Sequence, residues 1–493
     1  MKVSKIFNGM DYRAIGEVDL DITNLACDTN KVQKGCAFFC IKGNNVDGHT
    51  FADNAVSKGA KLLVCEHPLD LDIPQIVVED TREAMAKGAG NFFGNPRDKL
   101  KIIGVTGTNG KTTTTYMIQS ILQDAGHKVG VIGTIGIVID KIKKPALLTT
   151  PDPIEFHSIL ADMVKASVDT VVMEVSAHAI ALHKMAGVIC DIGILTNVTQ
   201  DHLDFFKTFE NYAKTKKAFI TPDFCKIGVV NIDDAVGKSI VLNKERLANN
   251  FDVITFGLQN PCDVFSPEYN FSLKGTNYVI NLFDDVRNIN TKLIGKFNLY
   301  NALGAATACS LMGVKVDDIV KGLYDMDFVP GRFNVINLPN GTTAIIDYAH
   351  TPDGLLNILS AVRNVTENKV VSVFGCGGNR DTGKRPIMGQ ISGENSDFSI
   401  VTSDNPRLEK PEEIISQIEA GISEITQKYL CITDRRTAIR YALGILNPGD
   451  VAVISGKGAE EYMDTGGVKY PYNDTDTVME EYQNISQNEA RKW

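Results

Sequence analysis

The feature that most constrains the fold is the stretch of residues 101–115, KIIGVTGTNGKTTTT. Its apolar first part predicts a buried strand, and residues 112–125 carry apolar side chains at helical spacing. The turn between them consists of Gly107, Thr108, Asn109 and Gly110. A strand, a glycine-rich turn and a helix that opens on Gly-Lys-Thr predict a phosphate-binding loop rather than an ordinary strand–helix turn.

In a loop of this kind, backbone N–H groups contact phosphate oxygens, the lysine contacts the β- and γ-phosphates, and the first threonine holds Mg²⁺. Lys111 and Thr112 occupy these positions, with Thr113 beside them. The strict motif has a glycine where this chain has Val105, so the match is a variant.

Length and composition narrow the class of protein. A chain of 493 residues exceeds a single core and predicts about two to four domains. Hydrophobic residues make up 43% and charged residues 22%, which is typical of a soluble globular protein. The net charge of −10 argues against a dedicated nucleic-acid-binding protein.

The N-terminal residues do not form a signal peptide, and no run of about eighteen apolar residues is present to span a membrane. The ten cysteines are scattered without C-x-x-C pairs. We therefore expect reduced thiols in a cytoplasmic protein rather than disulfides or a zinc site. No sequence feature sets an oligomeric state, and a monomer is the default expectation.

Alternating strand and helix patterns predict an α/β protein of three domains. Turn-rich residues near 95–98 and the pair Pro330-Gly331 mark the boundaries, which gives domains of residues 1–98, 99–330 and 331–493. We expect a mostly parallel sheet with the phosphate-binding loop in the central domain. We expect a Rossmann-like, doubly wound sheet in the C-terminal domain.

Strands are predicted in the first domain at residues 35–41 and 61–64, and in the second at residues 128–133, 169–175, 192–196, 226–231 and 253–256. A β-rich patch is predicted at residues 278–282 and 293–294, followed by a helix at residues 298–312. In the third domain the predicted strands are residues 343–346, 369–374, 399–402 and 450–454, and the predicted helices residues 353–363 and 411–428.

Polar residues follow several central strands, where an open α/β sheet gathers its ligands. Glu174 ends an apolar run; because a buried acid is costly without a cation, it is a candidate Mg²⁺ ligand, with a lysine ion pair as the alternative. His202 lies in a polar turn between two aspartates, which leaves both a metal or phosphate role and a structural role open. Lys216 has other lysines beside it, and spacing alone predicts a solvated helix face.

Four strands of the third domain are each followed by a polar motif, namely DYAH at 347–350, GCGGNRD at 375–381, DNPR at 404–407 and GKG at 456–458. Ordinary loop polarity explains each motif singly, but parallel strands end at one edge, where all four converge. Arg380 and Arg407 can each bind a carboxylate with two hydrogen bonds, and Asp404 can bind an ammonium. This set suits a zwitterionic amino acid.

Together these motifs resemble those of the Mur ligases, the ATP-dependent ligases that build the peptide of bacterial cell-wall precursors. The resemblance covers nearly the whole chain, in domain order and motif order. The segments that carry it are GTNGKTTTT, MEVSAH, TNVTQDHLD, GKFNLYNA, PGRF, DYAHTPD, FGCGGNRD, DNPR and GKG. In this family DNPR marks members that use 2,6-diaminopimelate, because its arginine binds the distal carboxylate that lysine lacks.

The resemblance implies that diaminopimelate is added to UDP-N-acetylmuramoyl-L-alanyl-D-glutamate in two steps. The γ-phosphate of ATP moves to a substrate carboxylate and gives an acyl phosphate. The incoming amine then displaces phosphate through a tetrahedral intermediate. Lys111 is implied to steady the phosphates, and the residues implied to hold Mg²⁺ are Thr112, Glu174, His202 and Lys216, the last as a carbamate.

The resemblance also implies binding residues in each domain. On the nucleotide these are Asn298 and Asn301 near adenine, and Arg332 and Asp347 near ribose and phosphates. For the UDP-sugar peptide they are Thr29, residues 42–49, Thr149, Thr150, Ser176 and Lys184. For the amino acid they are Arg380, Asp404, Asn405, Arg407, Gly456 and Glu460.

Four positions depart from the family pattern. Asn30 and Lys184 stand where the UDP-sugar side usually has arginine, Ala177 replaces the second serine of a pair, and Ala459 replaces the histidine of GKGHE. None of the four is a phosphate or metal residue, so the reaction type stands. They affect the grip on the UDP-sugar and the shape of the amino-acid pocket.

Other functions fit the sequence less well. A lysine-adding ligase of the same kind is disfavoured by Arg407. A folylpolyglutamate synthetase shares the central and C-terminal architecture but lacks this N-terminal domain and the DNPR motif. A GTPase switch would need an Asn-Lys-x-Asp motif, which is absent from the sequence. A catalytically idle P-loop nucleotide-binding protein is the remaining class, although every expected phosphate and metal residue is present.

Overall fold

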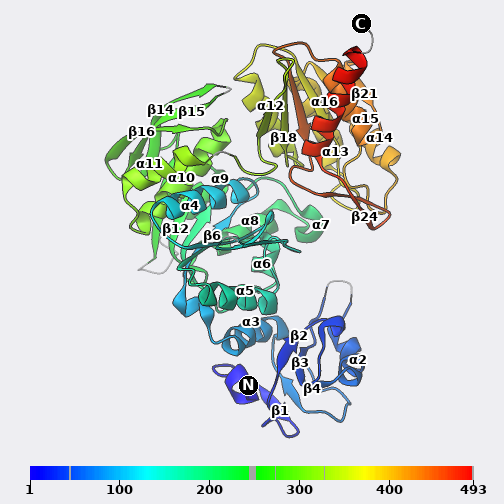
Figure 1. Cartoon of the computed structure of the whole chain (residues 1–493). Helices are drawn as coiled ribbons and strands as arrows, with labels where there is room; N and C mark the ends of the chain where they lie inside the picture. The colour runs from blue at the N-terminus through cyan, green and yellow to red at the C-terminus, as the bar shows by residue number, and fades with distance from the viewer. Residues whose placement is uncertain (44–45, 141, 244–250, 273, 327, 491–493) are drawn as a thin grey trace.

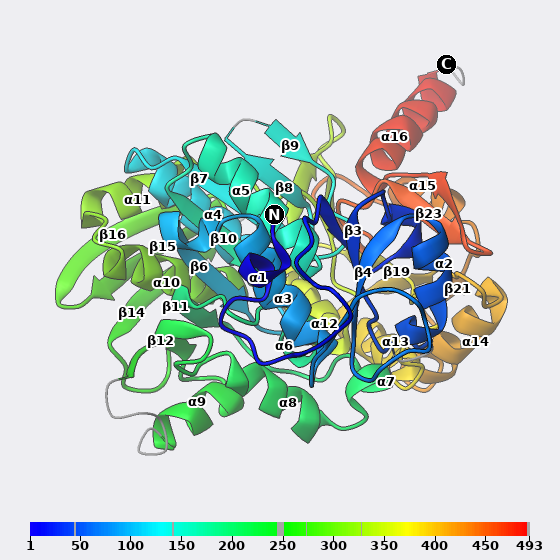
Figure 2. The same ribbon diagram turned by 90° about the horizontal axis from the view of Figure 1, so that it is seen from below.

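The computed structural model describes residues 1–493 except 44–45, 141, 244–250, 273, 327 and 491–493. Three α/β units follow one another along the chain, with the N-terminal unit at one end of the molecule and the C-terminal unit at the other (Figure 1). The predicted α/β class, with a parallel-rich central sheet, is confirmed. In both views the free end of α16 (Asp474–Ala490) points away from the central sheet (Figure 1, Figure 2).

The N-terminal sheet has the order β1-β5-β4-β3-β2, and only β1 runs antiparallel to its neighbour. Its strands are β1 Arg13–Ile15, β2 Asn24–Ala26, β3 Cys36–Phe39, β4 Ala60–Cys65 and β5 Gln75–Val77. Its helices are α1 Val3–Ile6, α2 Ala52–Ser57 and α3 Thr81–Phe92. Helix α3 packs against α5 (Pro153–Lys165) of the central unit, which joins the two units.

The central sheet has the order β16-β15-β14-β13-β12-β11-β6-β10-β7-β8-β9. Its parallel middle consists of β6 Lys101–Thr106, β7 Val129–Gly133, β10 Thr170–Glu174, β11 Cys190–Leu195, β12 Cys225–Asn231 and β13 Asp252–Gly257. The middle continues on one side into β14 Val264–Ser272, which runs parallel to β13, and antiparallel strands extend both edges, namely β8 Gly136–Ile139, β9 Ile142–Lys144, β15 Gly275–Leu282 and β16 Asp285–Thr291. The strand predicted at residues 293–294 is wrong, because these buried apolar residues lie in the loop after β16.

Helices cover both faces of this sheet and form two hydrophobic cores. One face carries α4 Lys111–Asp124, α10 Lys296–Leu311 and α11 Val316–Asp325. The other carries α5 Pro153–Lys165, α6 Ala177–Ala181, α8 Phe209–Ala218 and α9 Ala235–Leu242. Successive residues of β6 alternate between these cores, since Ile102 packs into one and Ile103 into the other. A strand buried on both faces is therefore apolar throughout, as the sequence shows.

The C-terminal sheet has the order β17-β18-β22-β19-β20-β21, and all pairs except β17 with β18 are parallel. The strands are β17 Asn334–Asn337, β18 Thr343–Asp347, β19 Val370–Phe374, β20 Phe398–Val401, β21 Tyr429–Cys431 and β22 Val451–Ser455. Helices α12 Pro352–Arg363, α13 Lys384–Asn395 and α14 Pro411–Ile422 cover one face. Helices α15 Arg435–Gly444 and α16 cover the other, as a doubly wound sheet requires. Helix α14 ends six residues before the predicted 428, because the chain turns there to enter β21.

Polar caps fix where several helices begin. The side chains of Asp80, Asp234 and Asp434 accept backbone N–H groups at the starts of α3, α9 and α15. Among the described residues, no helix is both long and apolar enough to cross a bilayer. All ten cysteines are free.

A buried ion pair holds α16 on the C-terminal sheet. Arg435 donates to both carboxylate oxygens of Asp474 at 2.8 and 2.7 Å, and both side chains are fully buried. Arg435 also donates to the Ser455 carbonyl at 3.0 Å, which ties the pair to β22. Removing one partner of such a pair leaves an uncompensated buried charge.

We predict that Asp474→Ala destabilises the C-terminal unit by roughly 3–5 kcal/mol, because the Arg435 guanidinium loses its counter-ion. Glu480→Ala is the matched control, since Glu480 lies on the same helix as Asp474 but pairs with Arg436 of α15 at the surface. The control should cost less than about 1 kcal/mol. Urea unfolding followed by circular dichroism measures both, and equal shifts for the two variants would contradict a special role for the buried pair.

Candidate functional site

The phosphate-binding loop lies between β6 and α4, at the carboxyl edge of the central sheet. Gly110 caps α4 with φ +86°, a left-handed conformation that L side chains rarely adopt. A Cβ there would lie 2.3 Å from Asn301 Oδ1, so the loop and α10 can approach only because the residue is glycine. Lys111 Nζ donates to the carbonyls of Gly107 and Thr108, each at 2.9 Å, and thus folds over its own loop.

Glu174 ends β10, the strand beside β6, and its side chain is buried. Its Oε1 accepts hydrogen bonds from Thr134 N at 2.8 Å and from Thr112 Oγ1 at 3.0 Å. Its Oε2 accepts from Thr134 Oγ1 at 3.1 Å. Carboxylate and hydroxyl oxygens therefore converge at the start of α4, which is a donor set that suits Mg²⁺.

Lys216 of α8 is buried, with only 1% of its surface exposed, so the solvated face predicted from spacing is wrong. Its Nζ donates to Gly107 O at 2.8 Å and to Thr106 Oγ1 at 3.1 Å, directly beneath the phosphate-binding loop. Burial, reinforced by the charge of Lys111, lowers the pKa of Lys216 well below its usual range. The amine thus has a strong tendency to be neutral and nucleophilic.

His202 lies near this group, in the loop after β11. Its backbone is left-handed, with φ +55°, and its Nε2 is 3.4 Å from Asp201 Oδ2. Its ring packs edge-on against His178, with 4.9 Å between centroids. Burial lowers the pKa of His202, with the charges of Lys111 and Lys216 contributing, so a neutral imidazole is favoured. A neutral imidazole is the form that binds metals.

Residues of the C-terminal unit reach the phosphate-binding loop directly. Arg332 donates to Thr112 Oγ1 at 3.2 Å and packs over the Tyr348 ring at 4.4 Å. Asn109 Nδ2 donates to Asp353 Oδ2, the first-turn acid of α12, at 2.7 Å. The loop is therefore bonded to both the end of its own sheet and the start of the next unit.

A cavity of about 300 Å³ opens along this junction. Its lining comes from both units and includes Asn109, Gly110, Thr112, Thr113, Asn301, Arg332 and Asp347. Asn298 stands behind the lining, where its Oδ1 accepts from Asn301 Nδ2 at 3.2 Å. Burial raises the pKa of Asp347, although Arg332 and backbone N–H groups oppose the shift. The predicted nucleotide residues are thus brought together around one space.

The predicted amino-acid residues gather at the carboxyl edge of the C-terminal sheet. Arg407 donates to Gly378 O at 2.8 Å, and a Cβ built on Gly377 would lie 2.7 Å from its guanidinium and 3.9 Å from Arg380. A Cβ on Gly456 would lie 2.4 Å from Asp404 Oδ2. Asn405 Nδ2 donates to Glu460 Oε2 at 2.7 Å. All six predicted residues therefore belong to one cluster of contacting loops. They are Arg380, Asp404, Asn405, Arg407, Gly456 and Glu460.

The predicted UDP-sugar residues form a group beside Glu174 and a separate position in the N-terminal unit. Thr150 Oγ1 donates to Glu174 O at 2.9 Å and accepts from Ser176 N at 3.0 Å. Thr149 Oγ1 is 3.1 Å from Thr134 Oγ1. Lys184 pairs with Asp152 at 2.9 Å. Thr29 lies in the N-terminal unit, and within the predicted loop of residues 42–49 positions 44 and 45 lie outside the described residues.

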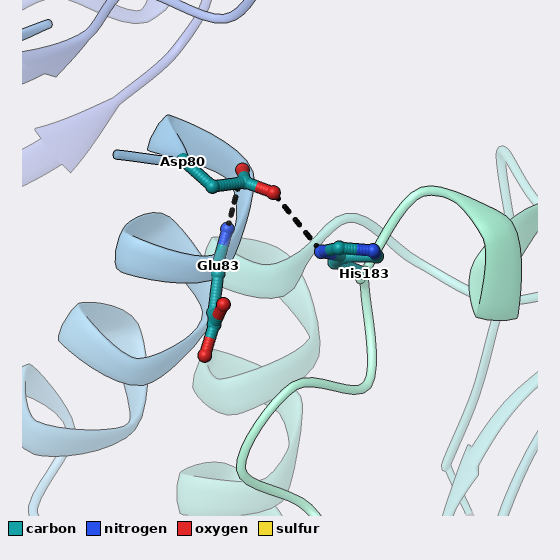
Figure 3. A group of neighbouring side chains, drawn as sticks. All are labelled: Asp80, Glu83 and His183. Carbon is teal, nitrogen blue, oxygen red and sulfur yellow. Dashed lines mark hydrogen bonds and ion pairs between the residues drawn. The ribbon is translucent and has the colours of Figure 1, made fainter. Parts of the chain in front are cut away.

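A second contact joins the N-terminal and central units close to Lys184. Asp80 Oδ2 lies 3.1 Å from His183 Nδ1, while its other oxygen caps α3 (Figure 3). Glu83 stands next to them but pairs with Lys87 at 2.6 Å. Since each acid already has a partner in the protein, this group acts as a contact between units.

Sequence reasoning missed several residues that the structure brings to the site. Thr134 supplies two of the hydrogen bonds to Glu174, and Asp353 receives the loop residue Asn109. Tyr212 bonds Thr108 Oγ1 at 3.1 Å. The signal for Asp353 was its place in the DYAHTPD motif, and that for Thr134 its position just after a predicted strand. Tyr212 has no local signal, because α8 reaches the loop only through tertiary packing.

We predict that Gly110→Ala weakens binding of ADP at least about tenfold, because its Cβ displaces Asn301 and distorts the N–H groups that face phosphate. Gly126→Ala is the matched control: it lies at the other end of α4 with φ +87° and no atom within 4 Å of its Cβ. Both variants carry the strain of a left-handed alanine, about 1 kcal/mol. Calorimetric titration with ADP measures the difference, and equal affinities would refute the close approach as a requirement.

Comparisons with known proteins extend this picture. The family described as Mur ligase family, catalytic domain, matches residues 21–93, the Mur ligase middle domain matches residues 105–309, and the Mur ligase, glutamate ligase domain, matches residues 331–458. The chain is 42% identical over 485 residues to the UDP-N-acetylmuramoyl-L-alanyl-D-glutamate–2,6-diaminopimelate ligase 1 of Clostridium acetobutylicum, covering 97% of this chain and 99% of that one. It is 40% identical over 461 residues to the ligase of that name from Geobacillus kaustophilus, covering 92% and 93%.

A solved structure of a UDP-N-acetylmuramoyl-L-alanyl-D-glutamate–2,6-diaminopimelate ligase is similar over 99% of both chains, with a TM-score of 0.69 and 28% identity. The resemblance expected from the motifs is confirmed. On the strength of these matches and of the site geometry, this chain belongs to the Mur ligase family.

Proposed function

We propose that the protein is an ATP-dependent ligase that joins diaminopimelate to the D-glutamate γ-carboxylate of UDP-N-acetylmuramoyl-L-alanyl-D-glutamate. The observation that carries the proposal is the 3.2 Å hydrogen bond from Arg332 to Thr112. It sets the phosphate-binding loop of one unit against the unit whose sheet edge holds the amino-acid residues. Reactions between a nucleotide and an amino acid need these two groups of residues to face one space.

In this proposal the chain's own residues handle the phosphates. The N–H groups at the start of α4 and the helix dipole stabilise the anionic oxygens. Lys111 exchanges its contacts with Gly107 and Thr108 for the β- and γ-phosphates, and Arg332 approaches the same oxygens from the opposite unit. Transfer of the γ-phosphoryl group to the substrate carboxylate forms an acyl phosphate and leaves ADP.

The residues present fit Mg²⁺. Thr112 and Glu174 already place oxygen donors 3.0 Å apart, and burial lowers the pKa of His202 against the opposing charge of Asp201, which favours the metal-binding form of the imidazole. Lys216 would join them as a carbamate, formed when its neutral amine attacks CO₂, makes a C–N bond and loses a proton. When bound, Mg²⁺ would neutralise charge on the phosphates as they react. The carbamate would also bring a negative charge next to Lys111, at a position where burial disfavours a lysine cation.

The second half of the reaction uses the C-terminal loops. Arg407 and Arg380 would bind carboxylates of the diamino acid, and Asp404 and Glu460 an ammonium. The attacking amine must first lose a proton; its nitrogen then bonds to the acyl carbon, and the tetrahedral intermediate expels phosphate. Arg407 carries the choice of diaminopimelate over lysine, since lysine has no distal carboxylate to pair with it.

The remaining assignments follow the same proposal. The UDP-sugar peptide would be bound by Thr29, residues 42–49, Thr149, Thr150, Ser176 and Lys184. The departures Asn30, Ala177 and Lys184 would change the contacts with this substrate, and Ala459 would change the shape of the amino-acid pocket. We place the unit boundaries at residues 98/99 and 330/331.

The ten free thiols and the nucleotide substrates favour a function in the cytoplasm, and the protein is proposed to act as a monomer.

The decisive experiment measures phosphate release with ATP, Mg²⁺ and UDP-N-acetylmuramoyl-L-Ala-D-Glu, and compares meso-diaminopimelate, L-lysine and no amino acid. Release that requires diaminopimelate supports the proposal. Phosphate release with lysine would support the ligase reaction but contradict the role of Arg407 in selecting diaminopimelate. No release in any mixture would favour a folate-type ligase or an idle nucleotide-binding protein.

We predict that Arg407→Ala raises the KM for diaminopimelate while ATP binding stays nearly intact. Loss of a bidentate carboxylate contact corresponds to roughly 2–4 kcal/mol in kcat/KM. Arg363→Ala is the control, because Arg363 lies on α12 of the same unit and pairs with Asp397 on the surface. Steady-state kinetics with each substrate varied in turn give the answer, and an unchanged KM for diaminopimelate would reject the role.

We further predict that Lys216→Arg lowers kcat at least about a hundredfold, because arginine keeps the charge but cannot carry the carbamate that would hold Mg²⁺. Lys214→Arg, on the exposed side of the same helix, should leave kcat unchanged. A carbamate carbon signal should appear in ¹³C NMR after incubation with ¹³C-bicarbonate and vanish in Lys216→Arg. Full activity of Lys216→Arg would exclude the carbamate.

A further inference from the structure

Lys457 is a buried lysine with no part in the reaction described so far. It lies in the GKG turn just after β22, and none of its surface is exposed. An unpaired ammonium in such a place is strongly unfavourable, so contacts with its partners must compensate for the loss of hydration. Those partners are the residues that form the amino-acid pocket.

The ammonium of Lys457 has two oxygen acceptors and two aromatic neighbours. Nζ donates to Glu460 Oε2 at 2.7 Å and to Asn405 Oδ1 at 3.0 Å. It also lies over the rings of Tyr462 and Tyr472, 5.6 and 5.9 Å from their centroids. An anion on one side and π faces on the other hold the cation in one place.

These contacts determine the orientation of the Asn405 amide. Its Oδ1 accepts from Lys457 Nζ and from Asp464 N at 2.8 Å, while its Nδ2 donates to Glu460 Oε2 at 2.7 Å. A lysine can only donate, so it admits the oxygen of the amide and excludes the flipped form. Asn405 is 2% exposed, and its side chain is engaged mainly inside the protein.

The same chain of contacts reaches Arg407. Asp464, held through its N–H by Asn405, accepts Arg407 N on its own carbonyl at 2.9 Å. Gly466 N donates back to Arg407 O at 2.6 Å. Arg407 has a left-handed backbone, with φ +52°, which is costly for an arginine and needs such support. The hairpin of β23 (Tyr462–Thr465) and β24 (Val468–Pro471) provides it.

We propose that Lys457 is a positioning residue of the amino-acid pocket, which acts through Asn405 to fix Glu460 and Arg407; the inference rests on the ligase function proposed above. Lys457 itself does not touch the substrate. Glu460 keeps its second oxygen, Oε1, for the incoming ammonium, and Asn405 serves as a support for its neighbours. The pocket thus recognises a diamino acid through groups that a buried cation aligns.

Lys457→Met tests the proposal, because methionine retains an apolar stem of similar reach and removes the charge and the donors. We expect the KM for diaminopimelate to rise at least about tenfold, while the KM values for ATP and the UDP-dipeptide change less than about twofold. A purely structural role would lower the melting temperature and affect all three substrates alike. Unchanged KM for diaminopimelate in the folded variant would overturn the proposal.

Lys369→Met is the matched control, since Lys369 lies at the opposite end of the same sheet and faces the Phe398 ring at 5.8 Å. It should leave every KM unchanged. If Lys457→Met does not fold, Lys457→Leu takes its place, because leucine keeps a buried apolar side chain and likewise removes the charge and the donors. The same selective rise is expected, and a uniform loss would overturn the proposal.

The experiments distinguish a failure of the proposed ligase function from a failure of the role proposed for Lys457. Wild-type protein that releases no phosphate with diaminopimelate would refute the ligase reaction. Wild-type activity combined with unchanged kinetics in Lys457→Met would refute only the role of Lys457.

Discussion

The structure of the site depends on one electrostatic constraint, which is that cationic side chains from three different elements gather around the buried carboxylate of Glu174. Glu174 ends a central strand, while Lys111, Lys216 and Arg332 approach it from a loop, a helix and the neighbouring unit. Burial lowers the pKa of both lysines, although the charge of Glu174 opposes the shift. Cationic side chains at the positive end of α4 favour the binding of an anionic ligand such as a polyphosphate at this junction.

The same constraint explains which parts of the site the sequence could predict. A strand, a glycine turn and a lysine at a helix start are local, so the phosphate-binding loop could be located from residues 101–115 alone. Glu174 was recognisable because an acid that ends an apolar strand breaks the pattern around it. The spacing of Lys216 did not identify it, since its helix looks solvated in sequence and only tertiary packing against Gly107 buries it; the family resemblance alone pointed to it.

The fold shows the same division. Parallel strands were predictable because burial on both faces makes them mostly apolar, as β6 and β19 are apart from Lys101, Thr106 and Ser372. The edge strands β14 and β16 were missed, because they are rich in polar and exposed residues and contain no apolar run. Residues 293–294 are apolar enough for a strand, yet they pack as a buried loop. Apolar composition predicts that such positions are buried. Whether the segment forms a strand depends on whether a neighbouring strand is available to pair with it.

The nucleotide and amino-acid groups meet at a backbone contact, where no side chain stands between them. Gly331 has φ +66°, and a Cβ on it would lie 2.0 Å from Ala459 N in the loop that carries Glu460. The next residue is Arg332, which bonds Thr112 in the phosphate-binding loop. Because these two backbones touch, we expect a shift of Arg332 toward bound phosphate to displace the GKG loop as well. Such a shift would couple nucleotide binding to the geometry of the pocket that Lys457 and Glu460 help to form.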